Sequence, residues 1–439
     1  MFPLAGSGLE TDRLNAIKDL LRGVDVASTD AAMIDQIRGL EELTAAAAAK
    51  MMIITAAFAA SQRAAQAAAG VPAARVGRGV SAQVGLARRM SPHQANRYVG
   101  QAIILTRELP ECFAQLLAGV VPEWRVLQVA QHTAWLSPEH RAVVDAEIAP
   151  ELEYLGNRAT IDRTKQIAYR LDPRSYVDRL AHAETERHVS TRPAPDCMMY
   201  LTALLPVKQG VSVRAALEAH AAAIVGVGAE TRTRGQVMAD TLIERVTGQS
   251  TADDVAVTVN LIMTDQALFN TGDHSDEPAY LVGAGVIPAE TARRLVRDPT
   301  GDNTVFLRRL YTHPETGHLT AMDSQARVFT QNQRLFLLLR DQTCRTPYCD
   351  APIRHTDHIH PHNDGGPTTI TNGQGLCEAC NHAKQAPGWH QQPTPDRTGH
   401  ITTVTPTGHH YRSQPHDPPG TTTRTNPERG RLEPARSAA

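Results

Sequence analysis

Two closely spaced cysteine pairs near the C-terminal end constrain the fold of this chain more than any other feature. Cys344 and Cys349 are separated by four residues, Cys377 and Cys380 by two, and 27 residues lie between the two pairs. Two such knuckles can present their thiolates to one ion, so the spacing predicts a tetrahedral structural Zn²⁺ site. Zinc–thiolate bonds would stabilise a segment that is too small to be held together by burial alone.

The polar residues between these pairs indicate catalysis. Asp357 and His358 are adjacent in a β-compatible segment, so their side chains are expected on opposite faces of a strand. Asn381 follows the last cysteine at the start of a predicted helix, and Gly365-Gly366 is expected to turn the chain between two strands. Carboxylate and amide oxygens suit Mg²⁺ or Mn²⁺, and a neutral histidine can deprotonate an attacking water. The cysteines by themselves leave a non-catalytic zinc knuckle open.

In this order and spacing, the elements resemble the HNH endonuclease family. The motifs are Cys-x₄-Cys, Asp-His-Ile-x-Pro, Gly-Gly-x-Thr, Asn and Leu-Cys-x₂-Cys-Asn-x₂-Lys within residues 344–384. The resemblance implies that His358 is the general base and that Asp357 and Asn381 bind the catalytic Mg²⁺ or Mn²⁺. It also implies that Asn372 positions the histidine loop and that the four cysteines hold structural Zn²⁺. Many members carry His at the position of Asn381, which leaves the preferred catalytic metal open.

The remainder of the chain is expected to be mostly helical at first and mixed later. Its 439 residues are Ala-rich and only 4% aromatic, a composition that favours helices. Residues 30–69 contain no proline and predict one long helix, or two that are broken near Gly39. Helix starts are expected at Ser91-Pro92, Val121-Pro122 and Ser137-Pro138. β-rich segments at 198–207 and 255–263 alternate with helical ones at 215–225 and 235–246, and hairpins are expected at 306–322 and 401–411.

The predicted fold class is therefore α+β multidomain, with a mostly α-helical N-terminal region, a mixed α/β middle and a small C-terminal ββα-metal (HNH) module with a Cys₄ zinc site. The predicted division is 1–29 as an N-terminal lead, 30–196 as a helical domain, 197–330 as a mixed α/β region completing it, 331–390 as the nuclease module, and 391–439 as a hairpin extension with a disordered tail. Residues 30–330 and the run into Cys344 resemble a bacterial group in which an HNH module follows a "domain of unknown function 222".

Local patches must supply any affinity for DNA, because the net charge of the whole chain is −2. Five basic and five acidic residues balance within 330–390, whereas residues 61–100 carry six arginines and no Asp or Glu. Residues 80–106 predict helix, short turn, helix, which fits either a helix-turn-helix-like reader or an ordinary hairpin with solvated arginines. The candidate DNA contacts are Arg88, Arg89, Arg97 and Lys384. For Lys384, capping of the helix end is the alternative, and solvated side chains are expected at His355, His360, His362 and His382.

The N-terminal end shows no signal-peptide pattern, and the apolar stretch 44–60 is interrupted by Lys50. We therefore expect a cytoplasmic protein without membrane contact. The expected partner is DNA, as the resemblance to HNH endonucleases implies. Cys112 and Cys197 stand apart from the pairs and are expected to be core thiols. The predicted function is a metal-dependent DNA endonuclease that hydrolyses phosphodiester bonds by an HNH mechanism. The alternative is a non-catalytic zinc-containing DNA-binding or regulatory protein with a degenerate nuclease module. The sequence does not predict the oligomeric state.

Overall fold

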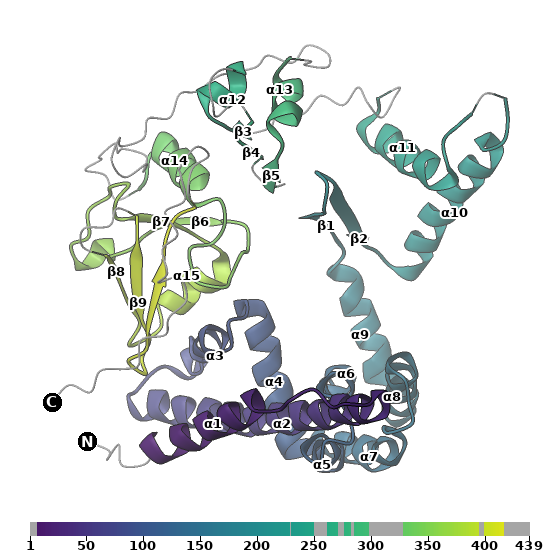
Figure 1. Ribbon diagram of the computed structural model, residues 1–439, viewed down its shortest axis with the longest axis vertical. Coiled ribbons are helices and arrows are strands. Elements are labelled where there is room, and N and C mark those ends of the chain that lie inside the picture. Colours follow the sequence, from purple (N-terminus) through teal and green to yellow (C-terminus); the bar gives the residue numbers. More distant parts are fainter. Residues whose placement is uncertain are drawn as a thin grey trace. The chain divides into compact units, whose positions relative to one another are not determined.

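The computed structural model describes residues 7–228, 230–249, 261–270, 276–281, 285–297, 328–394 and 399–416 (Figure 1). It divides into two compact units. The first combines Met1–Ala60 with Val99–Tyr176, and the second combines Ser61–Tyr98 with Val177–Ala439. The predicted hairpin at 306–322, the predicted strand residues 255–260 and the tail from 417 onward lie outside the described residues.

The first unit is helical. Its elements are α1 (Ser7–Arg22), α2 (Asp30–Ala68), α4 (Pro92–Glu108), α5 (Pro110–Leu117), α6 (Glu123–Thr133), α7 (Pro138–Ile148), α8 (Asn157–Leu171) and α9 (Pro173–Thr185), of which α2, α4 and α9 continue into the second unit. The predicted starts at Pro92 and Pro138 are confirmed, and Ser137 caps α7 by accepting a hydrogen bond from the His140 N–H. Helix α2 runs without a break through Gly39.

Helix α2 is longer than the apolar stretch 44–60 on which the expectation of no membrane span was based. At 39 residues it is long and apolar enough to cross a membrane by length and composition alone. A core helix passes the same test, and one face of α2 is buried inside the first unit. That face consists of Ala45, Ala48, Ala49, Met52, Thr55, Ala56 and Ala59.

Buried polar groups fix the ends of several helices in the first unit. The Asp145 carboxylate accepts hydrogen bonds from the N–H groups of Glu111 and Cys112 at 2.7 and 2.9 Å, which satisfies the start of α5. Arg141 pairs with Glu108 at 2.5 Å. Cys112 is a buried thiol as predicted, and burial raises its pKa above the ordinary range. The predicted core position of Cys197 is wrong, because this residue is exposed in the turn between two strands.

The second unit contains the elements of the mixed region. They are α3 (Val80–Arg88), β1 (His188–Pro193), β2 (Met199–Leu204), α10 (Val207–Ile224), α11 (Arg234–Thr247), β3 (Leu261–Ile262), α12 (Asp265–Phe269), β4 (Ala279–Leu281), β5 (Gly285–Ile287) and α13 (Ala289–Arg297). Strands β1 and β2 pair as an antiparallel ribbon, and β3, β4 and β5 form a small antiparallel sheet. The predicted helices at 215–225 and 235–246 correspond to α10 and α11.

The C-terminal end of the second unit holds the predicted small module. Its elements are α14 (Gln331–Asp341), β6 (His355–His358), β7 (Gly373–Leu376), α15 (Glu378–Lys384), β8 (His390–Pro393), β9 (Ile401–Val404) and β10 (His410–Ser413). Strands β6 and β7 are antiparallel and α15 packs on β6, while β8, β9 and β10 form a separate three-stranded sheet. The predicted fold class, with helices first and a ββα module last, is confirmed.

Candidate active site

The β6–β7 hairpin and α15 form the frame of the site. Asp357 pairs with Gln374 and His358 with Gly373 across the two strands, so Asp357 and Gln374 share one face of the hairpin while His358 lies on the other. Glycine is required at two positions of the frame. A Cβ on Gly366 would collide with the His360 carbonyl, and a Cβ on Gly375 would collide with the Ile353 side chain.

A buried ionic network fastens this frame to α14. The fully buried Asp341 carboxylate receives hydrogen bonds from Arg340 at 2.7 Å, from Arg345 at 2.8 Å and from the Gly375 N–H at 2.7 Å. Arg340 also donates to the carbonyls of Ile370 and Gly373, and so ties α14 to both ends of the loop before β7. Burial alone would raise the pKa of Asp341, but the two guanidinium groups hold it below its ordinary value. Arg340 and Arg345 are therefore structural cations rather than surface charges for DNA.

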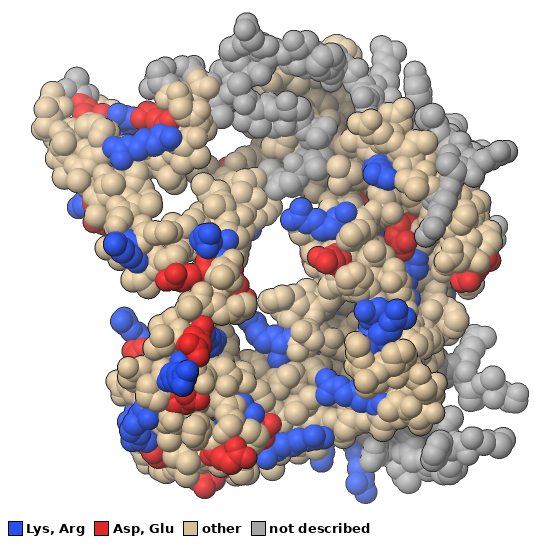
Figure 2. All heavy atoms as spheres, turned by 180° about the vertical axis from the view of Figure 1, so that it is seen from behind, with Lys and Arg blue, Asp and Glu red and all other residues tan. Residues whose placement is uncertain are grey.

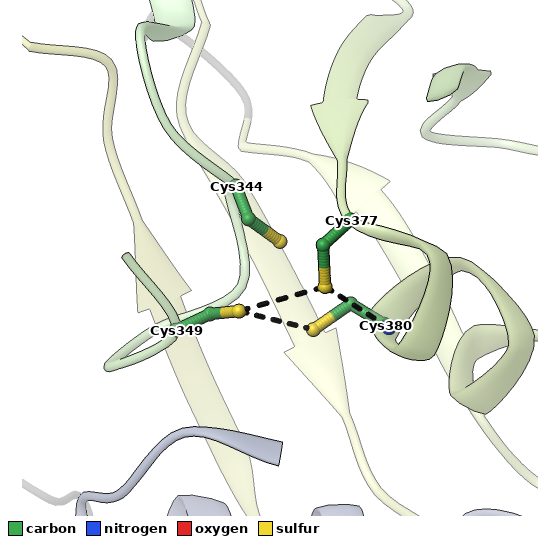
Figure 3. Close-up of side chains that lie close together, drawn as sticks. All are labelled: Cys344, Cys349, Cys377 and Cys380. Atoms are coloured by element: carbon green, nitrogen blue, oxygen red, sulfur yellow. Dashed lines mark hydrogen bonds between the residues drawn. The ribbon is translucent and has the colours of Figure 1, made fainter. Parts of the chain in front are cut away.

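The four predicted zinc cysteines converge. Figure 3 shows their sulfur atoms pointing toward one another, with Cys344 and Cys349 on a loop, Cys377 at the end of β7 and Cys380 in α15. All four sulfur atoms lie within 4.8 Å of one another, and Cys349 Sγ is 3.6 Å from the sulfur atoms of both Cys377 and Cys380. Tetrahedral bonds of about 2.3 Å place thiolates about 3.8 Å apart, so this cluster fits a zinc site.

The chain around the cysteines is already arranged as two knuckles. Tyr348 and Asp350 adopt left-handed backbone conformations on either side of Cys349 and turn its sulfur back toward Cys344. Cys377 caps α15, and its sulfur accepts a hydrogen bond from the Cys380 N–H at 3.5 Å. Hydrogen bonds from the other thiols, that of Cys344 first, hold the pKa of Cys377 below the ordinary thiol range. Without a metal, the thiolate is thus favoured at Cys377, whereas hydrogen bonds with the neighbouring thiols raise the pKa of Cys349 and of Cys380 above the ordinary thiol range.

His358 is held on the far side of the hairpin. Its Nε2 lies 2.9 Å from Thr368 Oγ1, and its ring centroid is 4.6 Å from that of Phe329. The His362 ring is also close, at 5.5 Å, on the short helical turn after Pro361. Ring packing and the Thr368 hydroxyl contact therefore help to orient this imidazole.

Asn372 closes the loop that carries His358 and His360. Its side chain accepts a hydrogen bond from the His360 N–H at 2.9 Å and donates to the carbonyls of His360 and Pro367 at 3.0 and 2.8 Å. The backbone adds a bond of 2.7 Å from the Ile359 N–H to the Asn372 carbonyl. The amide thus ties the end of β6 to the segment that leads into β7.

Lys384 lies against Asp357. Its ammonium group is 2.5 Å from Asp357 Oδ2 and also donates to the His358 carbonyl. The Lys384 side chain is 9% exposed, so this cation is directed inward and not toward a DNA phosphate. The ion pair joins β6 to the last turn of α15, and the contact of Lys384 with DNA phosphate stays a prediction.

Two amide oxygens near this ion pair have no hydrogen-bond partner. They are Oδ1 of Asn381 on α15 and Oε1 of Gln374 on β7, both buried. Gln374 uses its Nε2 to donate to Gln391 Oε1 at 2.7 Å, which directs its oxygen elsewhere. A buried acceptor without a donor is costly unless a cation satisfies it. Asp357 and Asn381 thus offer the hard oxygen donors that suit Mg²⁺ or Mn²⁺.

The arginine-rich stretch forms a helix, a tight turn and a second helix, as predicted. Helix α3 ends at Arg88, Arg89 takes a left-handed conformation, and α4 begins at Pro92. The Arg88 guanidinium stacks 3.8 Å above the Tyr98 ring, whereas Arg89 and Arg97 are exposed. Over the face drawn in Figure 2, basic and acidic side chains are scattered among uncharged ones. Arg89 and Arg97 are therefore the candidate DNA contacts with an exposed charge.

Sequence reasoning missed several residues of the site. The buried Arg340–Asp341–Arg345 network was not predicted, and neither were the contacts of Thr368, Phe329 and Gln374. One signal was present, because the Asp341 carboxylate stands directly before the first knuckle between two arginines. The exposed states of His355, His360, His362 and His382 agree with the prediction of solvated side chains.

Comparison with known proteins agrees with this architecture. Residues 37–341 match the family described as "Domain of unknown function (DUF222)", and residues 344–386 match the family described as "HNH endonuclease". The chain belongs to the DUF222 family and carries an HNH endonuclease domain after that region.

A relative in Mycobacterium tuberculosis, described as "Uncharacterized protein Rv3776", is 33% identical over 144 residues. That match covers 31% of this chain and 25% of the relative, so it spans about a quarter of the relative's own length. No solved structure matches this chain.

Proposed function

We propose that this protein is a metal-dependent DNA endonuclease that hydrolyses phosphodiester bonds. The observation that carries the proposal is that α15, which carries the unpartnered amide oxygen of Asn381, packs on the strand β6 that carries Asp357 and His358, within a module that matches the HNH endonuclease family. A divalent ion held by Asp357 and Asn381 would stabilise the charge that develops on the phosphate and the leaving oxygen.

In this mechanism His358 is the general base. Its Nε2 lies 2.9 Å from Thr368 Oγ1, which orients the ring, and the neutral imidazole takes a proton from the attacking water. Asn372 holds the loop that carries the histidine, and the zinc site holds the loop and helix together without entering the chemistry. DNA is the substrate class that the HNH family match favours.

The test is cleavage of supercoiled plasmid by the full chain, with Mg²⁺, with Mn²⁺ and with chelator. We expect nicked or linear product only with a divalent ion, and we expect His358→Ala to lower the rate about 10²–10⁴-fold. The matched control is His355→Ala, an exposed histidine on the same strand, which should cut at the rate of the unmodified protein. A His358→Ala protein that cuts normally would remove this residue from the mechanism.

One observation favours a second candidate, a non-catalytic zinc-containing DNA-binding or regulatory protein. The Lys384 ammonium already neutralises the carboxylate of Asp357. Protein that contains zinc and binds plasmid, but releases no product with either ion, would favour this second candidate.

A further inference from the structure

We infer that the helix α2 is an antiparallel dimerisation surface that binds the same helix of a second copy of this chain. The inference concerns helix α2, most of which lies in the first unit, and does not depend on the proposed nuclease activity. It starts from the face of α2 that the unit leaves exposed.

Apolar residues recur along this face with alternating spacings of four and three residues. They are Met33, Ile37, Leu40, Thr44, Ala47, Met51, Ile54 and Phe58, called here the α2 stripe. This is the a/d pattern of a coiled-coil seam. It is distinct from the face that begins with Ala45, Ala48 and Met52, which is buried in the core of the unit.

The α2 stripe is exposed over its central part. The exposed fractions are 63% for Ile37, 45% for Leu40, 41% for Met51 and 57% for Ile54. A surface helix normally packs one apolar face on the core and presents polar side chains to solvent on the opposite face. A helix with two apolar faces normally has protein packed against both. An uncovered row of this length is typical of a protein–protein interface.

The distribution of charge along α2 indicates that the α2 stripe binds a second copy of α2, and that the two helices are antiparallel. The first part, up to Glu42, holds four acidic residues and one arginine, whereas the rest holds Lys50 and Arg63 and no acid. Parallel pairing would set the acidic halves against each other. Antiparallel pairing sets each acidic half against the basic half of the other copy, so the surface is complementary to itself, as a two-fold interface requires.

The side chains of the stripe also match in this direction. About a two-fold axis between Thr44 and Ala47, Ile37 lies opposite Ile54 and Leu40 lies opposite Met51 of the second copy. Thr44 and Ala47 are small, and they permit the two helices to approach closely at the centre. Helix α1 carries another exposed row of apolar residues with the same spacing. That row is Leu14, Ile17, Leu21 and Val24.

The first experiment measures the mass of the full chain by sedimentation velocity over a range of concentrations. We expect a dimer, and we expect Ile37→Gln/Ile54→Gln to shift it to monomer, because both side chains are more than half exposed and their loss leaves the core intact. Leu40→Gln/Met51→Gln is a second, independent pair. The control is Val207→Gln, an apolar residue that is 84% exposed on α10 and should leave the dimer unchanged.

The direction of pairing is tested by disulfide trapping in a Cys197→Ser background, which removes the exposed native thiol. Antiparallel pairing predicts that Leu40→Cys protein crosslinks with Met51→Cys protein after mixing, and that neither crosslinks efficiently with itself. Self-crosslinking of Leu40→Cys would indicate parallel pairing and overturn the proposed direction. Three outcomes would overturn the proposed interface. The protein could be a monomer at all concentrations, or a dimer that both glutamine pairs leave intact. It could also be a monomer that sediments with phospholipid vesicles through α2.

Discussion

At the scale of single residues, the contact between Lys384 and Asp357 is the most informative feature of the candidate site. Asp357 supplies the only carboxylate of the proposed ion site, and Lys384 covers its Oδ2 at 2.5 Å. The same ammonium bonds the His358 carbonyl, so one cation holds the strand that carries both proposed active residues. Lys384 therefore positions Asp357 and would compete with a metal ion for its charge.

The substitution Lys384→Met separates these two effects. If charge competition dominates, removal of one positive charge a few ångströms from a divalent ion should tighten Mn²⁺ binding about tenfold, by a Coulomb term of roughly 1–2 kcal/mol in a solvated site. Titration of the protein with Mn²⁺, followed by electron paramagnetic resonance, measures this affinity directly. Weaker binding would mean that the positioning of Asp357 outweighs its neutralisation. Lys165→Met, a change in α8 of the first unit, is the control and should leave the affinity unchanged.

Asp341 leads to a prediction on stability and pH. At neutral pH, Asp341→Asn leaves the buried guanidinium groups of Arg340 and Arg345 without their carboxylate, which typically costs about 3–5 kcal/mol. The folded-state pKa of Asp341 is depressed, so its contribution is fully present above the ordinary carboxyl pKa of about 3.9 and is lost as the pH falls through the folded value. The difference between the two proteins should therefore shrink only below about pH 4.

Urea unfolding of the C-terminal module at a series of pH values measures that difference. The control is Asp364→Asn, an exposed carboxylate in the same module, which should change the stability by less than about 0.5 kcal/mol. An Asp341→Asn protein as stable as the unmodified one at pH 7 would contradict the role of the network.

At the scale of elements, the sequence predicted what local spacing determines. The cysteine knuckles, the strand at Asp357 and His358, the glycine turn and the helix at Asn381 follow from short-range patterns, and so does the long alanine-rich α2. Contacts between distant segments could not be predicted in this way. The Arg340 and Arg345 bonds join residues up to 68 positions apart, and nothing in a charge count separates a buried arginine from a solvated one. The prediction that Cys197 is buried was wrong for a similar reason, because the hydrophobicity of a residue does not show whether it lies in a turn at the surface.

The module elements give a prediction about zinc. Helix α15 has only seven residues, and its first turn is held by Cys377 and Cys380, so we expect its position to depend on a bound metal more than on burial. We expect one zinc per chain in protein prepared without added metal, and we expect Cys377→Ser to lose both the zinc and the ordered α15. Elemental analysis and the hydrogen exchange of the Asn381 amide measure the two effects. Cys112→Ser, a buried thiol of the first unit, should keep the zinc.

At the scale of the whole molecule, positive charge is distributed unevenly between parts with different tasks. In the module, Arg340 and Arg345 are buried in ion pairs and Lys384 is bound to Asp357, so few cations remain for phosphate. In the stretch 61–100, five of the six arginines are exposed, and in the described part of the chain none of the six pairs with a carboxylate. Glu108, at the end of α4, pairs with Arg141 and not with an arginine of this stretch. We therefore propose that this stretch supplies most of the affinity for DNA.

That proposal predicts the salt dependence of binding. Each phosphate contact contributes about −0.9 to the slope of log K against log salt, so Arg89→Ala/Arg97→Ala in the full chain should flatten the slope by roughly two units. Arg88→Ala should change the slope little and lower stability instead, because Arg88 stacks on Tyr98. Fluorescence anisotropy with a duplex in chelator, over a range of salt concentrations, gives the slopes without cleavage. Arg158→Ala/Arg179→Ala removes two exposed arginines from outside the stretch and should leave the slope unchanged. An unchanged slope in a folded Arg89→Ala/Arg97→Ala protein would mean that these arginines only solvate a helical hairpin, and that the phosphate contacts lie elsewhere.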